Sequence, residues 1–430
     1  MLFLTRIKKK FIHKAFLNQD SPAKQPHLAP SQDRTPSFQS GYGAHSGTEQ
    51  TLNAPPGSLN IALKNHTSSN TVFAYVTGLA LNDNNAPVLL QSDGKTLYYP
   101  QSPSSSCAPL SVNCAIPLGA SGSTVTVTIP KIAGGRIWFS VDKPLAFLVN
   151  PGPALVEPSV TNYSDPNINI SWAFCEFTYN DAQLFANISY VDFVSMPISL
   201  TLTNTSGGTQ HVAGMPSDGL ATVCNGLRKQ AAVDHQPWDQ LIYSHNGRPL
   251  RALSPNNLLV GNPNAFSGYW EPYIQKVWSR FSCNEMRINT QAAFGSICGR
   301  VKNGALELGA AGSFPQPSAA DIFSCSTGPF ATGNKTERNV VIPRLAAAFN
   351  RTTLLLCDEH PNGAHKGQYY NETITNHYSK IVHEANVDGR GYAFPYDDVT
   401  PDGGHDQCGA VMDGSPQLFT VAFGGAGGHV

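Results

Sequence analysis

The chain has 430 residues, more than a usual single domain, so the sequence predicts two domains or one large domain with an insertion. Charged residues make up only 13% of the chain, the formal net charge is −1, and glycine (38) and proline (32) are plentiful. This composition is typical of a turn-rich β protein with a polar, uncharged surface. It argues against a nucleic-acid-binding protein, which would show a basic excess, because the one basic cluster is residues 6–10 with Lys14.

Residues 1–56 are predicted to be a disordered or targeting lead-in. The opening MLFLTRIKKKFIHKAFLNQ has basic residues in its middle, so it is a poor signal peptide and too short and charged to span a membrane. Residues 19–56 are rich in Ser, Pro, Gln, His and Gly and carry hardly an apolar cluster, a composition typical of disorder. We therefore expect no membrane span.

Residues 57–207 are predicted to form a β domain. Short β-branched or aromatic runs alternate there with turn residues. The runs are LNIALKN, NTVFAYVTGLAL, APVLLQS, STVTVTIP, GRIWFSVD, LAFLVNPG, the stretch WAFCEFTYNDAQLFANISYVDFVSMP and PISLTLTN. Eight or more strands at this spacing indicate a sandwich or barrel.

Residues 208–375 are predicted to form a mixed α/β domain. Apolar residues recur there at three- and four-residue spacing in DGLATVCNGLRKQAA, WEPYIQKVWSRF and IPRLAAAFNRTTLLL, with Asp218 and Asn350 as residues that cap or end helices. Residues 376–430 return to strands, in GRGYAFPYDDV and SPQLFTVAFGG, and are expected to complete the first sheet system. The second unit is then an insertion in the β domain or an arm on it.

Cysteines and glycosylation sequons favour a secreted glycoprotein. Of the nine cysteines, Cys107 and Cys114 close a short loop suited to a disulfide, and Cys175, inside an apolar run, is a candidate free thiol. Asn-x-Ser/Thr sequons begin at Asn65, Asn162, Asn169, Asn187, Asn204, Asn334, Asn350 and Asn371.

Several chemistries have no motif in the chain. Signatures of serine hydrolases, HExxH metalloproteases, P-loop and dinucleotide-binding proteins are missing, and no CxxC occurs. The tract CDEHPNGAHKG, residues 357–367, gathers possible metal ligands, but its irregular spacing predicts a solvated loop. We therefore expect neither a metal nor a cofactor. Four tryptophans are expected in the core rather than as sugar platforms, namely Trp172, Trp238, Trp270 and Trp278.

Two acids interrupt apolar runs. Period two places Glu176, Thr178 and Asn180 on one face of a predicted strand, opposite Cys175, Phe177 and Tyr179. In the next run Asp192 shares a face with Ile188, Tyr190 and Val194, while Asp181 is a turn residue. Paired as antiparallel neighbours, the two runs would place the Glu176 and Asp192 carboxyls one or two strand spacings apart on one side.

Two interpretations of these acids stay open on pattern alone. Each acid pairs with an arginine or caps a loop, as most acids on β domains do, or the two form a catalytic pair. A catalytic pair of this kind would serve glycoside hydrolysis, with a protonated carboxyl as acid and an ionised one as base or nucleophile.

These same segments carry a family likeness. The blocks GGRIWFSV, LAFLVNPGPALVEPS, FCEFTYN, ISYVDFVSMPISL, ALSPNN and GYAFPYDDVT, taken in order, resemble glycoside hydrolase family 64, the β-1,3-glucanases of thaumatin-like fold. The likeness runs from about Leu59 to the C-terminus. It implies a mainly β protein with a thaumatin-like barrel or sandwich, an attached mixed α/β domain and a wide cleft between them.

The resemblance also implies a function. Family members are inverting, endo-acting hydrolases of β-1,3-glucan that need no metal. Their general-acid Glu matches Glu176 and their general-base Asp matches Asp192, while Thr178 and Asn180 match sugar-contacting positions. The alternative is a non-catalytic, glucan-binding protein of the same fold. In either case the expected partner is β-1,3-glucan and the expected state a secreted monomer.

Overall fold

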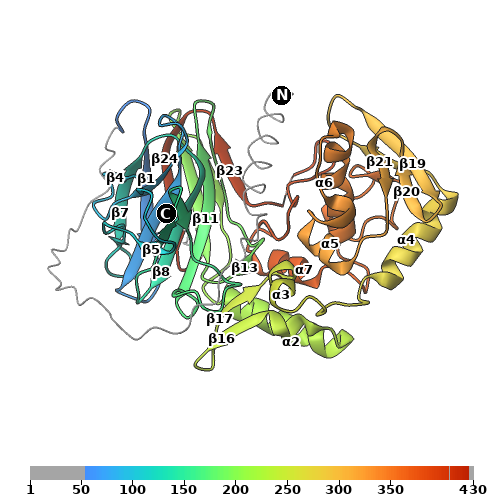
Figure 1. The fold of residues 1–430 in the computed structure, drawn as a ribbon, viewed down its shortest axis with the longest axis horizontal. Coiled ribbons are helices and arrows are strands. Elements are labelled where there is room, and N and C mark those ends of the chain that lie inside the picture. The colour runs from blue at the N-terminus through green and yellow to red at the C-terminus, as the bar shows by residue number, and fades with distance from the viewer. Residues whose placement is uncertain (1–53, 406, 426–430) are drawn as a thin grey trace.

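The computed structural model describes residues 54–405 and 407–425, and nearly all of the predicted lead-in, residues 1–53, lies outside them. Figure 1 shows a β-rich part, coloured blue to green, beside a part of helices and smaller sheets in yellow and orange. The red C-terminal segment runs back into the β-rich part. The prediction of a mainly β protein is confirmed. Among the described residues, no helix is long and apolar enough to cross a membrane.

Two sheets form the β-rich part. The first has the spatial order β15 (Thr209–Val212), β14 (Ile198–Asn204), β24 (Pro416–Phe423), β1 (Leu59–Asn65), β7 (Thr124–Ile129). The second has the order β23 (Ala410–Asp413), β12 (Leu184–Asn187), β11 (Ser171–Tyr179), β8 (Ile132–Val141), β2 (Val72–Ala80), β3 (Ala86–Leu90), β4 (Leu97–Tyr98), with β6 (Ile116–Pro117) beside β2.

The two sheets pack face to face because their strands alternate apolar and polar positions. Phe139 of β8 stacks on Phe423 of β24, with ring centroids 4.9 Å apart. Cys175 and Phe177 of β11 point into the same core. The C-terminal strands β23 and β24 enter one sheet each, as expected for the tail, while the division into domains at residues 207 and 375 stays a prediction.

The outer face of the second sheet carries a second apolar cluster. Trp138 of β8 and Trp172 and Phe174 of β11 pack there with Phe147 and Phe193. The small sheet β10 (Ala154–Val156), β9 (Leu148–Asn150), β5 (Ala108–Pro109) contributes to this side. All four tryptophans expected in the core are buried.

The remaining strands form two further sheets. One has the order β13 (Phe193–Val194), β17 (Arg248–Leu253), β16 (Ile242–His245), and the other β21 (Gly312–Phe314), β20 (Ala305–Leu308), β19 (Ser296–Lys302), β18 (Met286–Asn289), β22 (Glu359–His360). The α-helices are α2 (Gly219–Asp234), α3 (Pro255–Gly261), α4 (Glu271–Cys283), α5 (Ala319–Ser324), α6 (Thr336–Asn350) and α7 (His377–Ala385).

The three predicted helices are confirmed as α2, α4 and α6, and α6 ends at Asn350 as expected. Their apolar faces explain why they form: α4 buries Tyr273, Ile274 and Val277 at three- and four-residue spacing. Side-chain caps begin shorter helices, as where Ser254 accepts a hydrogen bond from the Asn257 amide at α3.

Three expectations are wrong. None of the nine cysteines is joined in a disulfide, so Cys107 and Cys114 are not bridged. The segment GRGYAFPYDDV is not a strand: after a single bridge between Tyr392 and Ser189 it forms turns. The tract at residues 357–367 is not wholly solvated, because His360 is buried in β22. Three of the glycosylation sequons also begin at buried asparagines, namely Asn65, Asn187 and Asn350.

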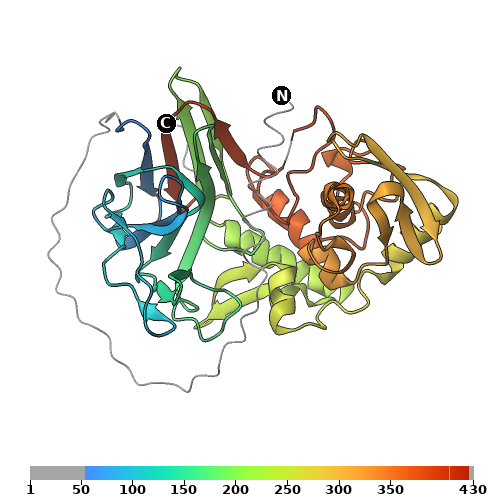
Figure 2. The ribbon, with the colours of Figure 1, turned by 45° about the horizontal axis from the view of Figure 1, so that its top comes forward.

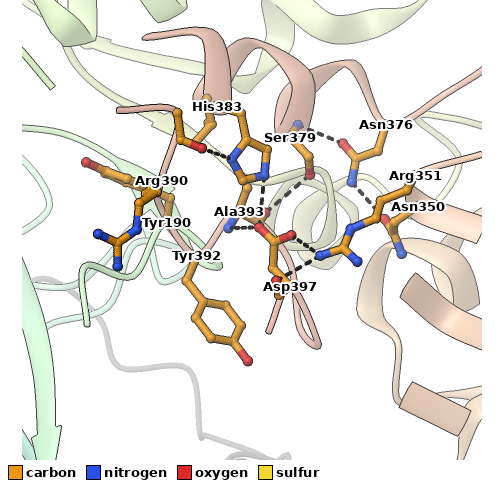
Figure 3. Close-up of polar contacts among 12 residues, drawn as sticks. Tyr190, Asn350, Arg351, Asn376, Ser379, His383, Arg390, Tyr392, Ala393 and Asp397 are labelled. Atoms are coloured by element: carbon orange, nitrogen blue, oxygen red, sulfur yellow. Dashed lines mark hydrogen bonds and ion pairs between the residues drawn. The ribbon is translucent and has the colours of Figure 1, made fainter. Parts of the chain in front are cut away.

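A buried charge network holds the turns that follow Tyr392 (Figure 3). Asp397, fully buried, accepts a hydrogen bond from Arg351 Nη2 at 2.8 Å and from the Ala393 amide at 3.0 Å, and its other contact is His383 Nε2 at 3.0 Å. Burial raises the pKa of Asp397, but the His383 and Arg351 groups outweigh burial and leave this pKa below its usual value. The network thus joins the C-terminal segment to α7 and to the residue after α6.

Replacing Asp397 by Asn should lower the free energy of unfolding by about 3–5 kcal/mol, because a buried Arg351 charge loses its partner. Urea unfolding at neutral pH measures this. Asp358→Asn, which removes the acid of a part-exposed pair with Arg280, is the control and should cost at most about 1 kcal/mol. Equal losses in the two variants would contradict the assignment.

The same pair predicts an acid dependence. Because the folded-state pKa of Asp397 is lowered, its contribution is present above the unfolded value of about 3.9. That contribution is lost as the pH falls through the folded-state pKa. Between about pH 3.9 and the lower folded-state pKa, the stability of the unsubstituted protein should therefore fall more steeply than that of Asp397→Asn.

Candidate active site

A row of four polar side chains crosses the outer face of the second sheet. Strand register places Thr77 of β2 beside Arg136 of β8, Arg136 beside Glu176 of β11, and Glu176 beside Asn187 of β12. Residues directly opposite in neighbouring strands point to the same side of a sheet. The row therefore lies next to the aromatic cluster on the outer face, with Trp138 and Phe174 two residues away along β8 and β11.

The alternation predicted for β11 explains the position of Glu176. Cys175 and Phe177 are buried between the sheets, whereas the Glu176 side chain is 32% exposed on the other face. The prediction that this strand has one packed and one polar face is confirmed at these positions. Asp181 lies in the turn between β11 and β12 and pairs with Lys131, as expected of a turn residue.

Arg136 is the cation of the site. Its guanidinium donates to Glu176 Oε1 from Nη2 at 3.3 Å and from Nε at 3.4 Å, and to Glu157 Oε2 from Nη1 at 2.6 Å. It also lies over the Phe174 ring, 4.9 Å from the centroid. Burial opposes the charge of Arg136, but Glu157, Glu176 and Asp192 together raise its pKa above the usual value. Three carboxylates therefore surround one guanidinium.

Asp192 does not lie in a strand, which corrects the expectation of two antiparallel neighbours. Strand β12 ends at Asn187, the Tyr190 amide then donates to the Tyr392 carbonyl at 2.7 Å, and the chain bends at residues 191 and 192. It continues as β13, which pairs with β17 in another sheet. Pairing with the distant Tyr392 overrides the local alternation, and Asp192 stands where the chain leaves the large sheet.

The start of α3 holds Asp192 in place. The Asp192 carbonyl accepts hydrogen bonds from the Ser254 amide and from Asn257 Nδ2, both at 2.9 Å. Behind it, the Tyr378 hydroxyl of α7 donates to the Tyr190 carbonyl at 2.6 Å. The start of α3 thus fixes Asp192 directly, and α7 fixes the chain two residues before it.

Both carboxyls have a raised pKa, and the charge of Asp192 acts on Glu176. Burial raises the pKa of Glu176, Arg136 lowers it, and the Asp192 charge raises it further, so that it stands above its usual value. Burial also raises the pKa of Asp192, against Arg136 and a hydrogen bond from Asn257. A raised pKa keeps a carboxyl protonated to a higher pH, which is the property that a general acid requires.

The other two predicted positions differ in their contacts. Thr178 lies at an irregularity of the β8 and β11 register, where its Oγ1 accepts from the Gly134 amide at 3.3 Å. Asn180 is beyond β11, and its Oδ1 accepts from the amides of Ala182 and Gln183 in the turn. The Asn180 side chain therefore shapes the hairpin, and sugar contact by either residue stays a prediction.

Sequence reasoning missed the residues of other elements that contact the two acids or the arginine beside them, namely Arg136, Glu157, Asn187 and Asn257. Arg136 and Glu157 had a signal, since each is a lone charge within or beside an apolar run, as Glu176 is. Within residues 54–405 and 407–425 no cluster of three or more His, Cys, Asp or Glu is arranged to hold a metal ion.

Comparison with known proteins places the chain in a family. The family model described as β-1,3-glucanase, glycoside hydrolase family 64, matches residues 57–423. The chain belongs to this family. Curated members include glucan endo-1,3-β-glucosidases of Arthrobacter sp. (strain YCWD3) and Cellulosimicrobium cellulans, each 29% identical over 310 residues, 69% of this chain and 53% of the relative. The chain therefore spans about half the length of these curated family members.

Solved β-1,3-glucanase structures share the fold. A laminaripentaose-producing β-1,3-glucanase in complex with laminaritetraose superposes with a TM-score of 0.76 at 28% identity, covering 86% of this chain and 99% of that one. A β-1,3-glucanase domain from Clostridium beijerinckii has a TM-score of 0.67 at 20% identity, with the same coverage, which is a likeness of fold.

Replacing Gly135 by Ala should disturb the site of this β-1,3-glucanase family member through packing. A Cβ at Gly135 would lie 2.5 Å from the Phe177 ring on the packed face of the sheet, one position along the strands from the paired Arg136 and Glu176. Overpacking of this kind costs about 1–3 kcal/mol, measurable by urea unfolding. Gly333→Ala, which meets no atom within 4 Å, is the control and should leave stability nearly unchanged.

Proposed function

We propose that this protein is an endo-acting, inverting hydrolase of β-1,3-glucan, with Glu176 as general acid and Asp192 as general base. The observation that carries the proposal is a pair of carboxyls from β11 and from the bend after β12, each with a raised pKa and each within the field of Arg136. Membership of the β-1,3-glucanase family indicates which bond is cut, the β-1,3-glucosidic bond. A protein that only bound glucan would have no need of two coupled acids.

The pair performs one displacement. Asp192, ionised, takes a proton from a water that attacks the anomeric carbon, while Glu176, protonated, donates its proton to the glycosidic oxygen as the bond to that carbon breaks. The products are a new reducing end of inverted configuration and a free hydroxyl on the leaving chain. Inversion needs carboxyls about 6.5–9.5 Å apart, leaving room for the water. Attachment of the two acids to different elements, β11 and the bend after β12, suits such a spacing.

The glucan would lie along the outer face of the second sheet. Figure 2 shows this sheet on one side and the helices α5 and α6 on the other, with α7 between. We propose that a thaumatin-like sandwich and the mixed α/β part enclose a wide cleft there, and that Thr178 contacts sugar beside Glu176. An open cleft of this kind admits the interior of a chain, which is what endo action requires. Secretion, glycosylation and a monomeric state remain predictions.

Purified protein incubated with laminarin should release reducing ends. Glu176→Gln and Asp192→Asn should each lower kcat by about 10²–10⁴-fold with little change in binding, since each acid acts in the transition state. Asp181→Asn, an exposed turn acid of the same hairpin, is the matched control and should keep its activity. Undiminished release by Glu176→Gln would remove that residue from the mechanism.

Two further readouts separate the finer claims. Proton NMR of early products should show the α-anomer first, whereas the β-anomer first would indicate a retaining enzyme. A rapid fall in viscosity relative to reducing ends would mark endo action. Glucan binding without any release of sugar by the unsubstituted protein would favour the alternative, a glucan-binding protein.

A further inference from the structure

The contacts of Glu176 present a difficulty for a proton donor. Its nearest cation, Arg136, lies 3.3 Å from Oε1, and an adjacent guanidinium favours the ionised carboxylate. A general acid must hold its proton at the working pH. Another group in the site must therefore weaken the tendency of Arg136 to ionise Glu176.

Glu157 makes the closest contact of Arg136. Its Oε2 lies 2.6 Å from Nη1, against 3.3 and 3.4 Å for the two contacts to Glu176. Glu157 also stabilises the positive charge of Arg136 more than Glu176 or Asp192 does. The arginine is thus primarily the partner of Glu157 and only secondarily that of Glu176.

A chain of hydrogen bonds fixes Glu157. It follows β10, so it reaches the polar row from a different sheet. Its Oε1 accepts from the Thr77 hydroxyl at 2.9 Å, and the Thr77 hydroxyl accepts from Nε1 of the buried Trp138 at 3.0 Å. Oε1 of Glu157 is thus held by Thr77 while Oε2 contacts Arg136, and this arrangement holds the carboxylate against the guanidinium.

We propose that Glu157 is a positioning residue that holds Arg136 and balances its charge, so that Glu176 keeps the proton it donates. The inference rests on the proposed function of Glu176 as general acid. Glu157 touches no reacting atom in this scheme and acts through Arg136.

The charges around the site agree with this role. Arg136 from β8 and Asp192 act on Glu176, with the Cys175 thiol as its neighbour in β11. Arg136 and Glu157 act on Asp192, and the charge of Asp192 in turn acts on Tyr378 of α7. Without Glu157 the guanidinium is free to pair fully with Glu176 and to ionise it. The loss would also remove a negative charge that raises the pKa of Asp192.

The first test is the pH dependence of kcat/KM on laminarin. In Glu157→Gln the basic limb, which reports the general acid, should move to lower pH by on the order of 1 unit, with the acidic limb moving the same way. Glu157→Asp keeps the charge and should keep the limbs near their original positions, whereas Glu157→Asn, its size-matched partner, should show the shift. Asp358→Asn, which breaks an arginine pair elsewhere, should leave the profile unchanged.

The second test needs no glucan. Protein labelled with ¹³C at the glutamate carboxyls is titrated by NMR, and Glu176→Gln identifies the Glu176 signal. That signal should titrate at lower pH in Glu157→Gln than in the unsubstituted protein. If the shift is seen but laminarin is never cut, the proposed function fails and the role of Glu157 in balancing Arg136 stands.

The opposite result would overturn the inference. This result has two parts: the unsubstituted protein cuts laminarin normally, and Glu157→Gln loses activity without any change in the Glu176 titration or in the pH profile. Glu157 would then have a structural role alone. Should Glu157→Gln fail to fold, the comparison of Glu157→Asp with Glu157→Asn gives the same decision, because these two differ in charge at equal size.

Discussion

The polar row on the outer face of the second sheet depends on a single guanidinium, that of Arg136. Acids from three separate elements act on it, and the Phe174 ring lies beneath it. A half-buried arginine needs such partners, because its partial desolvation carries a cost that opposite charges offset. The carboxylates in turn gather close together only because this cation offsets their repulsion. Strand register, aromatic packing and the acids of the site are thus mutually dependent.

Much of the architecture could be predicted from local pattern. The run LNIALKN corresponds to β1 residue for residue, and the helical spacing found α2, α4 and α6, because alternation and amphipathicity are set by neighbours in sequence. The predictions that are wrong concern segments whose conformation is set by contacts with distant parts of the chain. Asp192 bends because the chain before it pairs with Tyr392, and residues 389–399 turn because Asp397 is drawn to Arg351 and His383.

The candidate site also has a part that the sequence predicts and a part that depends on distant contacts. Glu176 and Asp192 are visible in the sequence as acids in apolar runs, and the family likeness singles them out. Their surroundings are not visible, because the row from Thr77 to Asn187 exists only once four strands are in register. Glu157 arrives from yet another sheet, and Asn257 from the start of α3. The type of each residue can be read from the sequence. The balance of charge between the residues depends on which strands and loops the fold brings together.

The position of β24 has a consequence for how the chain can assemble. This strand lies between β14 and β1 in the first sheet and runs parallel to β1, so nearly the whole sequence separates two neighbouring strands. Such non-local pairing makes folding slow and leaves strand edges exposed meanwhile. During synthesis the first sheet must wait, with β1 and β14 lacking the strand between them, until the last described residues have been made. The sandwich that carries the acids is therefore completed only when β24 has been made, long after β1 has become available.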